Sequence, residues 1–365
     1  MSEAAESGER AETAFGDGQG DQPMVSVIIP VRNEQGYIGP CLQALAQQDY
    51  PRERFEVIVL DGESTDATAR EAEAAAAEFG VPDAFLTNRR RTTAAGLNLG
   101  LSLARGEIIV RVDGHTLVDP TFLSASVRAL VESGADAVGG PIRSKGRGPV
   151  GQAIALAVSS PFGVGDAAFR HSNREQWVDS VAFAAYRREV FDRIGLFDEA
   201  IDHGEDDEFN YRLRQAGGRI LLTPSIGSIY YSRSSYAALA RQYWRYGLAK
   251  VSVLRKHPGR LRARHLAPSA LVLALAGSGL LALVSRRFAP LLGLVAGVYG
   301  VAVFAASLRV AARGGHWRLL PYLPPAFACV HLPAGAALLV GLGRLLAGER
   351  RKAPFDKLRT PRRGE

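Results

Sequence analysis

The chain has 365 residues, a formal net charge of +7 at pH 7 and a hydrophobic content of 47%. Its length allows one large domain or two ordinary ones. The positive charge first suggests nucleic acid, but the basic residues crowd into the C-terminal third, where they flank apolar segments as in membrane proteins. We therefore expect a membrane as a partner and no nucleic acid.

The first 23 residues are polar and rich in Gly, Ala and Glu. They lack the apolar run of a signal peptide, so we expect a disordered leader over residues 1–23. The domain that follows would then remain in the cytoplasm.

Short apolar runs alternate with helical patterns in the first part of the chain. The runs VSVIIP (25–30), FEVIVLDG (55–62) and EIIVRVDG (107–114) predict buried strands. Helices are expected from about residue 38 to 48 and over 64–79, where Ser64 or Thr65 can cap an alanine-rich segment. This alternation predicts an α/β domain with a parallel sheet covered by helices on both faces.

Polar residues follow each predicted strand: Arg32-Asn33-Glu34, Asp61-Gly62 and Asp113-Gly114-His115. The carboxyl ends of parallel strands meet at the edge where such sheets bind ligands. Asp before Gly is also a common turn. Each stretch alone therefore leaves a metal or ligand site and an ordinary turn both open.

The run GEDDEF (204–209) opens an amphipathic helix predicted over residues 205–215. A solvated helix start explains the acids, because the helix dipole favours each by roughly 0.3–1 kcal/mol. A carboxylate held at a rigid helix end as a general base explains them equally well.

The run RQYWRYG (241–247) places Gln242, Arg245 and Tyr246 on one face if it is helical. An arginine there can clamp a phosphate. The alternative is an amphipathic helix lying on a membrane surface.

Residues 143–176 show weak periodicity and predict a mobile loop with a helix inside it. Residues 266–284 and 288–308 are apolar over about the ~20 residues that a membrane span needs. Arg286 and Arg287 separate them, which predicts a hairpin. Residues 319–347 are interrupted by prolines and predict one long kinked helix or two short passes.

Basic residues lie on both sides of the apolar region: Arg255, Lys256, Arg260, Arg262 and Arg264 before it, and Arg350, Arg351 and Lys352 after it. Positive charge favours the cytoplasmic side for both groups. An odd number of spans cannot satisfy both, so the last segment would be re-entrant or cross twice. The expected divisions are a leader (1–23), a cytoplasmic domain (24–250), a basic interfacial linker (251–265), transmembrane helices (266–347) and a basic tail (348–365).

Five segments over residues 24–250 together resemble, in order, the motifs of the inverting family-2 glycosyltransferases with the GT-A fold. They are VSVIIPVRNE, VIVLDGESTDAT, EIIVRVDGH, GEDDEFNYRL and QYWRY. Within that family the chain is most similar to ExoA-type enzymes of succinoglycan and related exopolysaccharide synthesis.

The resemblance implies a Rossmann-like, nucleotide-sugar-binding GT-A domain followed by transmembrane helices. Asp206 would be the catalytic base, with Glu205 beside it. Asp113 would meet the donor diphosphate through Mg²⁺ or Mn²⁺, and His115 is the second metal candidate. The substrate-binding residues would be Pro30, Arg32, Glu34, Asp61, Arg91, Asp113, Gln242, Arg245 and Tyr246.

Two positions depart from the family pattern. His115 replaces the second Asp of Asp-x-Asp, which ExoA-like sequences tolerate, and Tyr246 replaces the Trp of Gln-x-x-Arg-Trp. Because Mn²⁺ accepts imidazole better than Mg²⁺ does, His115 favours Mn²⁺ or a direct contact with phosphate.

The implied function is a multi-pass enzyme of the bacterial inner membrane with a cytoplasmic catalytic domain. It would move a sugar, first of all glucose from a UDP-sugar, to a hydroxyl of a lipid-linked or polysaccharide acceptor in exopolysaccharide synthesis. The alternatives are a processive polysaccharide synthase and a non-catalytic membrane protein with a decayed transferase domain. An oxidoreductase would need a Gly-x-Gly-x-x-Gly loop, where this chain has PVRNEQGYIG.

Overall fold

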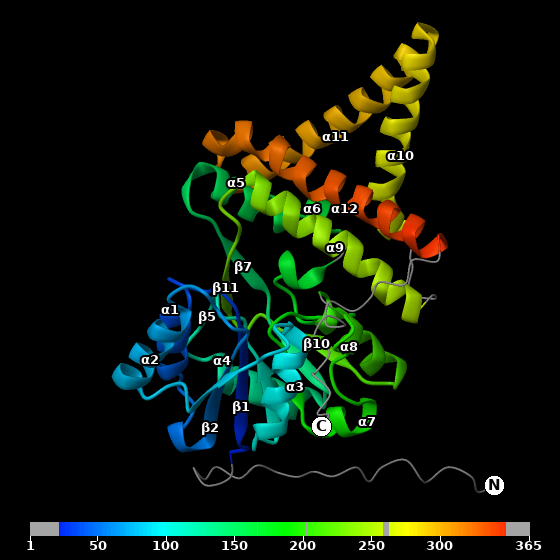
Figure 1. Cartoon of the computed structure of the whole chain (residues 1–365). Helices are drawn as coiled ribbons and strands as arrows, with labels where there is room; N and C mark the ends of the chain where they lie inside the picture. Colours follow the sequence, from blue (N-terminus) through cyan, green and yellow to red (C-terminus); the bar gives the residue numbers. More distant parts are fainter. Residues whose placement is uncertain (1–21, 166, 202, 258–262, 348–365) are drawn as a thin grey trace, which may run out of the picture.

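The computed structural model of the chain describes residues 22–165, 167–201, 203–257 and 263–347. Most of the expected leader, the whole basic tail and residues 258–262 of the expected linker lie outside the described residues. The remaining chain forms a sheet domain, below, and a group of long helices, above, in Figure 1.

A mixed sheet with the strand order β3-β2-β1-β4-β9-β6-β10-β8 forms the centre of the sheet domain. Its strands are β1 (Val25–Val31), β2 (Phe55–Asp61), β3 (Ala84–Thr87), β4 (Ile108–Arg111), β6 (Ala137–Gly139), β8 (Gln176–Trp177), β9 (Ala185–Arg187) and β10 (Ile220–Leu222). The four strands β1 to β4 are parallel to one another, as predicted. The prediction of an entirely parallel sheet was wrong beyond them, because β9 runs antiparallel to β4 and β6, and β8 antiparallel to β10.

The direction of β9 follows from the path of the chain before it. After β6 the chain leaves the sheet through β7 (Ile142–Lys145) and rises to α5 (Gly148–Val158) and α6 (Pro161–Val164) (Figure 1). It returns through a short 3₁₀ turn, Ala168–Arg170, and re-enters the sheet from the side on which it left. The expected mobile loop over 143–176 therefore contains two strands and two α-helices.

Both faces of the sheet are buried, since alternate residues of each strand point to opposite sides. Val27 and Ile29 pack with α1 (Ile38–Ala46), α2 (Thr68–Phe79) and α4 (Phe122–Ser133) on one face. Ile28 and Ile58 pack with α3 (Thr93–Leu103), α7 (Glu189–Ile194) and α8 (Glu205–Gln215) on the other. These apolar faces hold the carboxyl ends of the strands in fixed positions.

A second, three-stranded sheet lies beside the first, in the order β5-β11-β7. Its strands β5 (Thr116–Val118) and β11 (Ser228–Tyr231) are antiparallel, and β11 runs parallel to β7. β5 begins directly after His115, so the small sheet carries the loop after β4 towards the long helices.

The long helices are α9 (Tyr236–Lys256), α10 (Ala263–Val284), α11 (Ala289–Gly314) and α12 (Leu323–Leu346). Three stretches are long and apolar enough to span a membrane: Leu266–Val284, Arg286–Gly314 and Trp317–Leu346. α10 and α11 form the predicted hairpin (Figure 1). Of the two alternatives for the last segment, the structure has the single long helix, α12, with Pro333 inside it.

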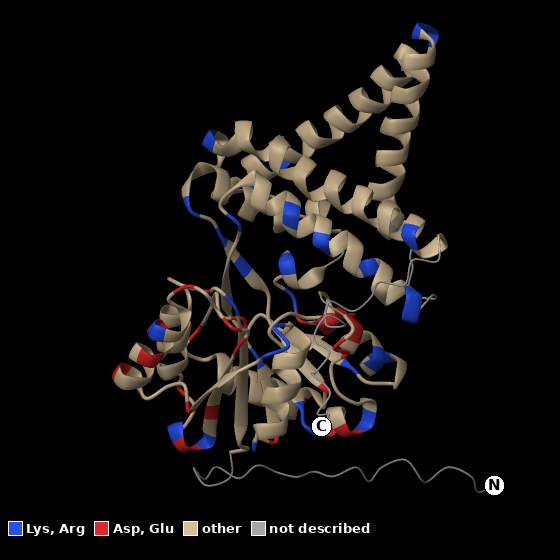
Figure 2. Cartoon of the chain, in the orientation of Figure 1, with Lys and Arg blue, Asp and Glu red and all other residues tan. Residues whose placement is uncertain are grey.

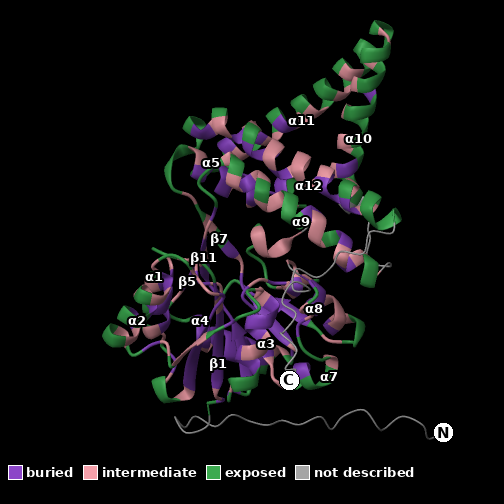
Figure 3. Ribbon diagram, viewed as in Figure 1, coloured by how far each residue is buried: buried purple, intermediate pink, exposed green. Residues whose placement is uncertain are grey.

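The α10–α11 hairpin is the least buried part of the helical group, as the green and pink colouring of Figure 3 shows. Only 11% of the apolar window is buried in each of the first two candidate spans, against 39% in the third. The third is more buried because α12 packs along α9, between the hairpin and the sheet domain (Figure 1).

α9 and α12 approach each other at two glycines. A Cβ on Gly247 of α9 would lie 2.5 Å from the carbonyl oxygen of Ala334. A Cβ on Gly341 of α12 would lie 2.6 Å from Cγ2 of Val251. The absence of a side chain at these two glycines therefore allows α9 and α12 to pack closely against each other.

Candidate active site

Three loops at the carboxyl ends of β1, β2 and β3 surround one edge of the sheet. Each contains a non-glycine residue in the left-handed region: Asn33 (φ 58°), Glu63 (φ 55°) and Arg91 (φ 59°). Such conformations cost free energy and persist only where contacts hold them. Asn33 accepts a hydrogen bond from the backbone N–H of Thr65 at 2.8 Å, and Glu63 is ion-paired with Arg91. The loops are therefore tied to one another.

Asp61 ends β2 and is buried, with 7% of its surface exposed. Its carboxylate accepts hydrogen bonds from the backbone N–H and the hydroxyl of Ser64. This contact explains a wrong prediction, because Ser64 serves Asp61 and neither it nor Thr65 caps α2, which begins at Thr68. Pro30 lies one residue before the end of β1, and Arg32 is exposed just beyond it.

A buried arginine at the end of β4 joins three of the acids at this edge. Arg111 Nη2 lies 2.9 Å from Glu205 Oε1 and 3.2 Å from Asp113 Oδ1, and Nη1 lies 3.7 Å from Asp206 Oδ2. Burial alone would lower the pKa of Arg111, but these three carboxylates raise it well above its usual value. The guanidinium is thus a permanent positive charge between α8 and the loop after β4.

The two adjacent acids at the start of α8 differ in exposure. The Glu205 side chain is 6% exposed and burial raises the pKa of its carboxyl, despite Arg111. The Asp206 side chain is 32% exposed, and its Oδ1 accepts the backbone N–H of Asp207 at 2.8 Å. Asp206 is therefore the acid of this pair that a substrate can reach.

α8 is anchored from below and from its side. Phe209 is fully buried and stacks on Phe197, with ring centroids 4.4 Å apart, while Asn210 accepts a hydrogen bond from Tyr186 at 2.9 Å. Glu208 lies 3.0 Å from His257 Nε2, just past the end of α9. A second ion pair, between Lys256 and Asp198, ties the same end of α9 to the loop before α8.

His115 turns away from Arg111 and contacts the loop after β1. Its Nδ1 lies 3.0 Å from Glu34 Oε1. Burial would lower the pKa of His115, but the hydrogen bond and charge of Glu34, with the charge of Asp113, raise the pKa to about 9. Gly114 between the two site residues is required by space, since a Cβ there would lie 2.6 Å from Val31 Cγ1.

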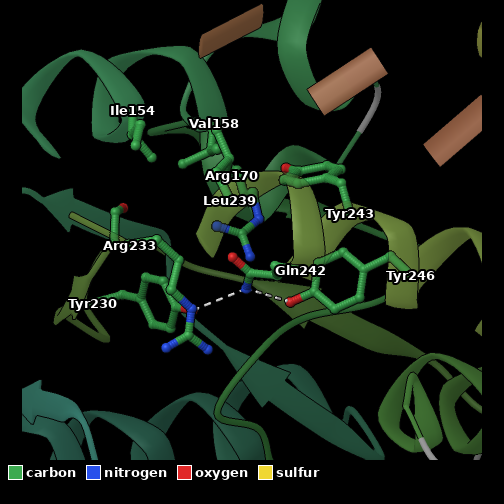
Figure 4. Close-up of a pocket in the computed structure, with 10 residues that line it drawn as sticks. Ile154, Val158, Arg170, Tyr230, Arg233, Leu239, Gln242, Tyr243 and Tyr246 are labelled. Atoms are coloured by element: carbon green, nitrogen blue, oxygen red, sulfur yellow. Dashed lines mark hydrogen bonds between the residues drawn. The ribbon is translucent and has the colours of Figure 1, made fainter. Parts of the chain in front are cut away.

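A tyrosine of β11 links His115 to α9. The rings of His115 and Tyr230 meet edge to face with centroids 5.0 Å apart. On its other side, Tyr230 accepts a hydrogen bond from Gln242 Nε2 at 3.4 Å, and the same nitrogen donates to Tyr246 at 2.9 Å (Figure 4). The helical prediction for residues 241–247 is confirmed, and Gln242 and Tyr246 share a face of α9.

The structure therefore brings most of the predicted site residues into one chain of contacts. It runs from Asp206 and Glu205 through Arg111 to Asp113, and from Glu34 through His115 and Tyr230 to Gln242 and Tyr246. Arg91 is directed to Glu63, Asp61 to Ser64, and Arg245 is exposed on α9. Sequence reasoning assigned no role to Arg111 or Tyr230, although a charged residue inside the apolar run of β4 was a signal for the first.

Comparisons with known proteins identify the family of the chain. The Glycosyl transferase family 2 pattern matches residues 26–195. The succinoglycan biosynthesis protein ExoA of Rhizobium meliloti (strain 1021) is 30% identical over 314 residues, which cover 80% of this chain and 94% of that protein. The chain therefore belongs to glycosyltransferase family 2.

A second relative is archaeal. The dolichyl N-acetyl-alpha-D-glucosaminyl phosphate 3-beta-D-2,3-diacetamido-2,3-dideoxy-beta-D-glucuronosyltransferase of Methanococcus voltae is 28% identical, over 64% of this chain and 74% of its own. Among solved structures, the mannosyltransferase PcManGT from Pyrobaculum calidifontis, in complex with GDP-Man and Mn²⁺, superposes with a TM-score of 0.55. It is 22% identical and the match covers 91% of this chain and 89% of that one, which shows a shared GT-A fold.

Proposed function

We propose that the protein is a membrane-bound, inverting hexosyltransferase. It moves a sugar, glucose from a UDP-sugar in the first instance, to a hydroxyl of a lipid-linked or polysaccharide acceptor during exopolysaccharide synthesis. Its place is the bacterial inner membrane, with the sheet domain in the cytoplasm. The names of the succinoglycan and dolichyl-phosphate relatives support the pathway class and the kind of acceptor.

One observation carries the proposal: a single buried arginine joins two acids of the α8 start to the Asp after β4. Asp206 is accessible at a rigid helix end and lies 3.7 Å from Arg111, while Glu205 is buried in the ion pair with it. The Asp206 carboxylate thus lies at the first turn of α8, beside the Arg111 guanidinium, where an acceptor hydroxyl could approach it. Glu205 holds Arg111 in place and so acts as a positioning residue.

The reaction follows from these positions. The nucleotide binds over the loops after β1 and β2, with Glu34, Asp61, Arg32 and Arg91 around it. Asp206 takes the proton of the acceptor hydroxyl as its oxygen forms a bond to the anomeric carbon. The bond from that carbon to the diphosphate breaks on the opposite side, which inverts the configuration, and the nucleoside diphosphate leaves with the electron pair.

The residues fit a divalent ion that the donor completes. Asp113 offers one partly exposed carboxylate, while the described part of the chain brings no three metal-ligating side chains together. Mg²⁺ and similar ions are commonly held by one or two carboxylates plus substrate phosphates and water. When bound at Asp113, such an ion would neutralise charge that develops on the diphosphate.

The attachment to the membrane follows from the charges on α9. Its basic residues Arg241, Arg245, Lys250, Arg255 and Lys256 are exposed and follow the helix in Figure 2. A helix with these charges lies at the membrane surface and not in hydrocarbon. Because α12 packs closely along α9, we infer that α12 stays at that level and that only the α10–α11 hairpin crosses.

The experiment that tests the function uses the full chain in membranes with a panel of labelled nucleotide sugars, with and without EDTA. Wild type should transfer one sugar to lipid-linked or glycan acceptors and lose activity with EDTA. Asp206→Asn should lower transfer by about 10²–10⁴-fold, the usual share of a general base, while binding the donor nucleotide as wild type does.

Loss of nucleotide binding in Asp206→Asn would mean that the base is misassigned. Transfer from no donor at all by the wild-type protein would favour the non-catalytic alternative.

A further inference from the structure

A pocket between α5, α9 and the end of β11 has no role in the proton transfer. Its polar lining includes Arg170, Ser232 and Arg233, with Tyr230 between them and the sheet domain. Arg170, Arg233 and Tyr230 lie around the Gln242 side chain in Figure 4. The pocket encloses about 10 Å³, and about 250 Å³ when its mouth open to solvent is included. A ligand group would therefore fit at the mouth and not in the closed part.

The opposite wall of this pocket is apolar. It consists of Ile154 and Val158 of α5 and Leu239 of α9. The same residues belong to a buried cluster that includes Phe327 and Val330 of α12. The apolar wall is thus continuous with the helices that we place at the membrane.

Among the described residues, one polar group of the pocket is buried without a hydrogen-bond partner, and two cations beside it have no carboxylate partner. Ser232 is 9% exposed, and its Oγ has no hydrogen-bond partner among the described residues. Across the described ranges, neither Arg170 nor Arg233 forms an ion pair with a carboxylate. Arg170 lies over the Tyr230 ring, 5.7 Å from its centroid. A buried hydroxyl without a partner, such as that of Ser232, is costly in proteins and indicates a missing ligand, whereas Arg170 is half-buried and Arg233 is exposed.

We propose that this pocket binds the phosphate end of the lipid-linked acceptor. Two guanidinium groups and the Ser232 hydroxyl are donors of the type that phosphate oxygens accept. The apolar wall would take the first carbons of the lipid chain. The ligand class is therefore a phosphate monoester or diphosphate on a long apolar chain.

The position of the pocket agrees with an acceptor site. Tyr230 forms its inner wall, and the other side of the same ring contacts His115. A phosphate between Arg170 and Arg233 would thus be separated from the loop that carries Asp113 by one aromatic ring. The sugar attached to that phosphate would extend towards Asp206.

This inference rests on the proposed function, because an acceptor phosphate has meaning only for a transferase that uses lipid-linked acceptors. A phosphate on an apolar chain is also found in bulk phospholipid. The experiment must therefore separate the acceptor from the surrounding membrane.

The test measures binding to the purified full chain in neutral detergent by native mass spectrometry. The probes are farnesyl phosphate, farnesol and phosphatidylglycerol. Arg170→Ala and Arg233→Ala should each weaken farnesyl phosphate binding by about tenfold or more, the effect of losing a charge-assisted hydrogen bond. Arg241→Ala removes an exposed arginine of α9 outside the pocket and should leave binding unchanged.

Ser232→Ala is the gentler variant. It should weaken farnesyl phosphate binding without lowering the thermal stability, since its hydroxyl has no partner to lose. Farnesol should bind far more weakly, and phosphatidylglycerol should not displace farnesyl phosphate at equal concentration.

The proposal would be overturned if Arg170→Ala and Arg233→Ala bound farnesyl phosphate as tightly as wild type does. An equal loss in Arg241→Ala, or displacement by phosphatidylglycerol, would also overturn it, because either would indicate a general headgroup site. UDP binding, measured on the same samples, reports the fold of each variant and the donor site. If wild type did not bind UDP, this would count against the proposed function. Farnesyl phosphate binding tests the pocket separately.

Discussion

At the scale of single residues, Arg111 has the largest number of charged neighbours in the site. It is 9% exposed and lies among Asp113, Glu205 and Asp206. A charged residue in a buried strand is retained only when it is paired. Its Nη1 is buried, has no hydrogen-bond partner within the described residues and lies 3.7 Å from Asp206 Oδ2, so it interacts with that carboxylate by charge alone.

Replacing Arg111 by methionine should destabilise the fold strongly. Removing one member of a buried ion pair typically costs about 3–5 kcal/mol, because the partner carboxylates lose their counter-charge. Urea unfolding of the full chain in detergent measures the loss. Arg143→Met is the matched control, since Arg143 is 56% exposed in its ion pair with Asp119 and should cost less than about 1 kcal/mol. Equal losses in both variants would contradict a special role for Arg111.

His115 allows a second test at this scale. His115→Asn should keep most of the transfer activity, because the amide can still donate to Glu34. His115→Asp should lower it, because a carboxylate there would face Glu34, whose Oε1 lies 3.0 Å from the imidazole. If His115→Asp instead keeps its activity and shifts the metal preference towards Mg²⁺, His115 is a metal ligand. Transfer rates over a series of Mg²⁺ and Mn²⁺ concentrations decide between the two.

At the scale of elements, the sequence predicted the strands and helices whose pattern of apolar residues lies within the element itself. The apolar runs gave β1, β2 and β4, and the helix predicted over 205–215 is Glu205–Gln215 in the structure. The direction of β9 was not predictable, because it depends on the path of the whole segment between β6 and β9 and not on the composition of β9 itself. The start of α2 was missed for the same reason, since the partner of Ser64 is a residue of the preceding strand.

Glu56 joins two strands and the turn before a third, and this makes stability depend on pH. It accepts hydrogen bonds from Ser26 Oγ at 2.6 Å and from the backbone N–H of Arg105 at 2.7 Å. Burial would raise the pKa of Glu56, but these bonds and the Arg105 charge lower it below its ordinary value of 4.5. A lowered folded-state pKa stabilises the fold above the unfolded-state pKa and loses that effect as pH falls through the folded value.

We therefore expect Glu56→Gln to be less stable than wild type at pH 7 and the difference to shrink below about pH 4.5. Denaturant unfolding of both proteins at a series of pH values measures it. A difference that stays constant down to pH 3 would show that the charge of Glu56 is not involved.

The contact between α9 and α12 is open to a direct test at Gly247. An added Cβ would lie 2.5 Å from the Ala334 carbonyl oxygen, so the helices would have to separate. Gly247→Ala should destabilise the helical group by roughly 1–3 kcal/mol, as overpacking usually does. Gly297→Ala in α11 is the control, because a Cβ there meets nothing within 4 Å. Thermal unfolding in detergent compares the two, and equal stability would exclude close packing at Gly247.

At the scale of the whole molecule, the candidate site was largely predictable as a set of strand ends, since parallel strands bring their ends together. The contacts that join these strand ends to one another and to α8 and α9 were not predictable. Arg111 and Tyr230 act through partners far away in the sequence, Glu205 and His115, and no local spacing reveals these contacts. The path of the last apolar segment was also undecided, because composition does not distinguish a span from a helix packed beside α9.

The topology can be tested with single cysteines at Ser285, His316 and Ala347, in a background without the partly buried Cys329. Ser285 lies at the turn of the hairpin, and the other two follow α11 and α12. If only the hairpin crosses, an impermeant maleimide added to intact cells should label Ser285→Cys alone. Labelling of Ala347→Cys from outside would show that α12 crosses as well.

The clamp between the end of α9 and α8 has a consequence for substrate choice. Glu208 with His257, and Lys256 with Asp198, fix the position of α8, the helix of Asp206, relative to α9, which we propose lies on the membrane. With Asp206 as the proposed base, the distance between the base and the membrane surface would then be the same for every acceptor. The fold would therefore select acceptors by length, and it would accept those glycans in which the distance between the reactive hydroxyl and the lipid matches this fixed distance.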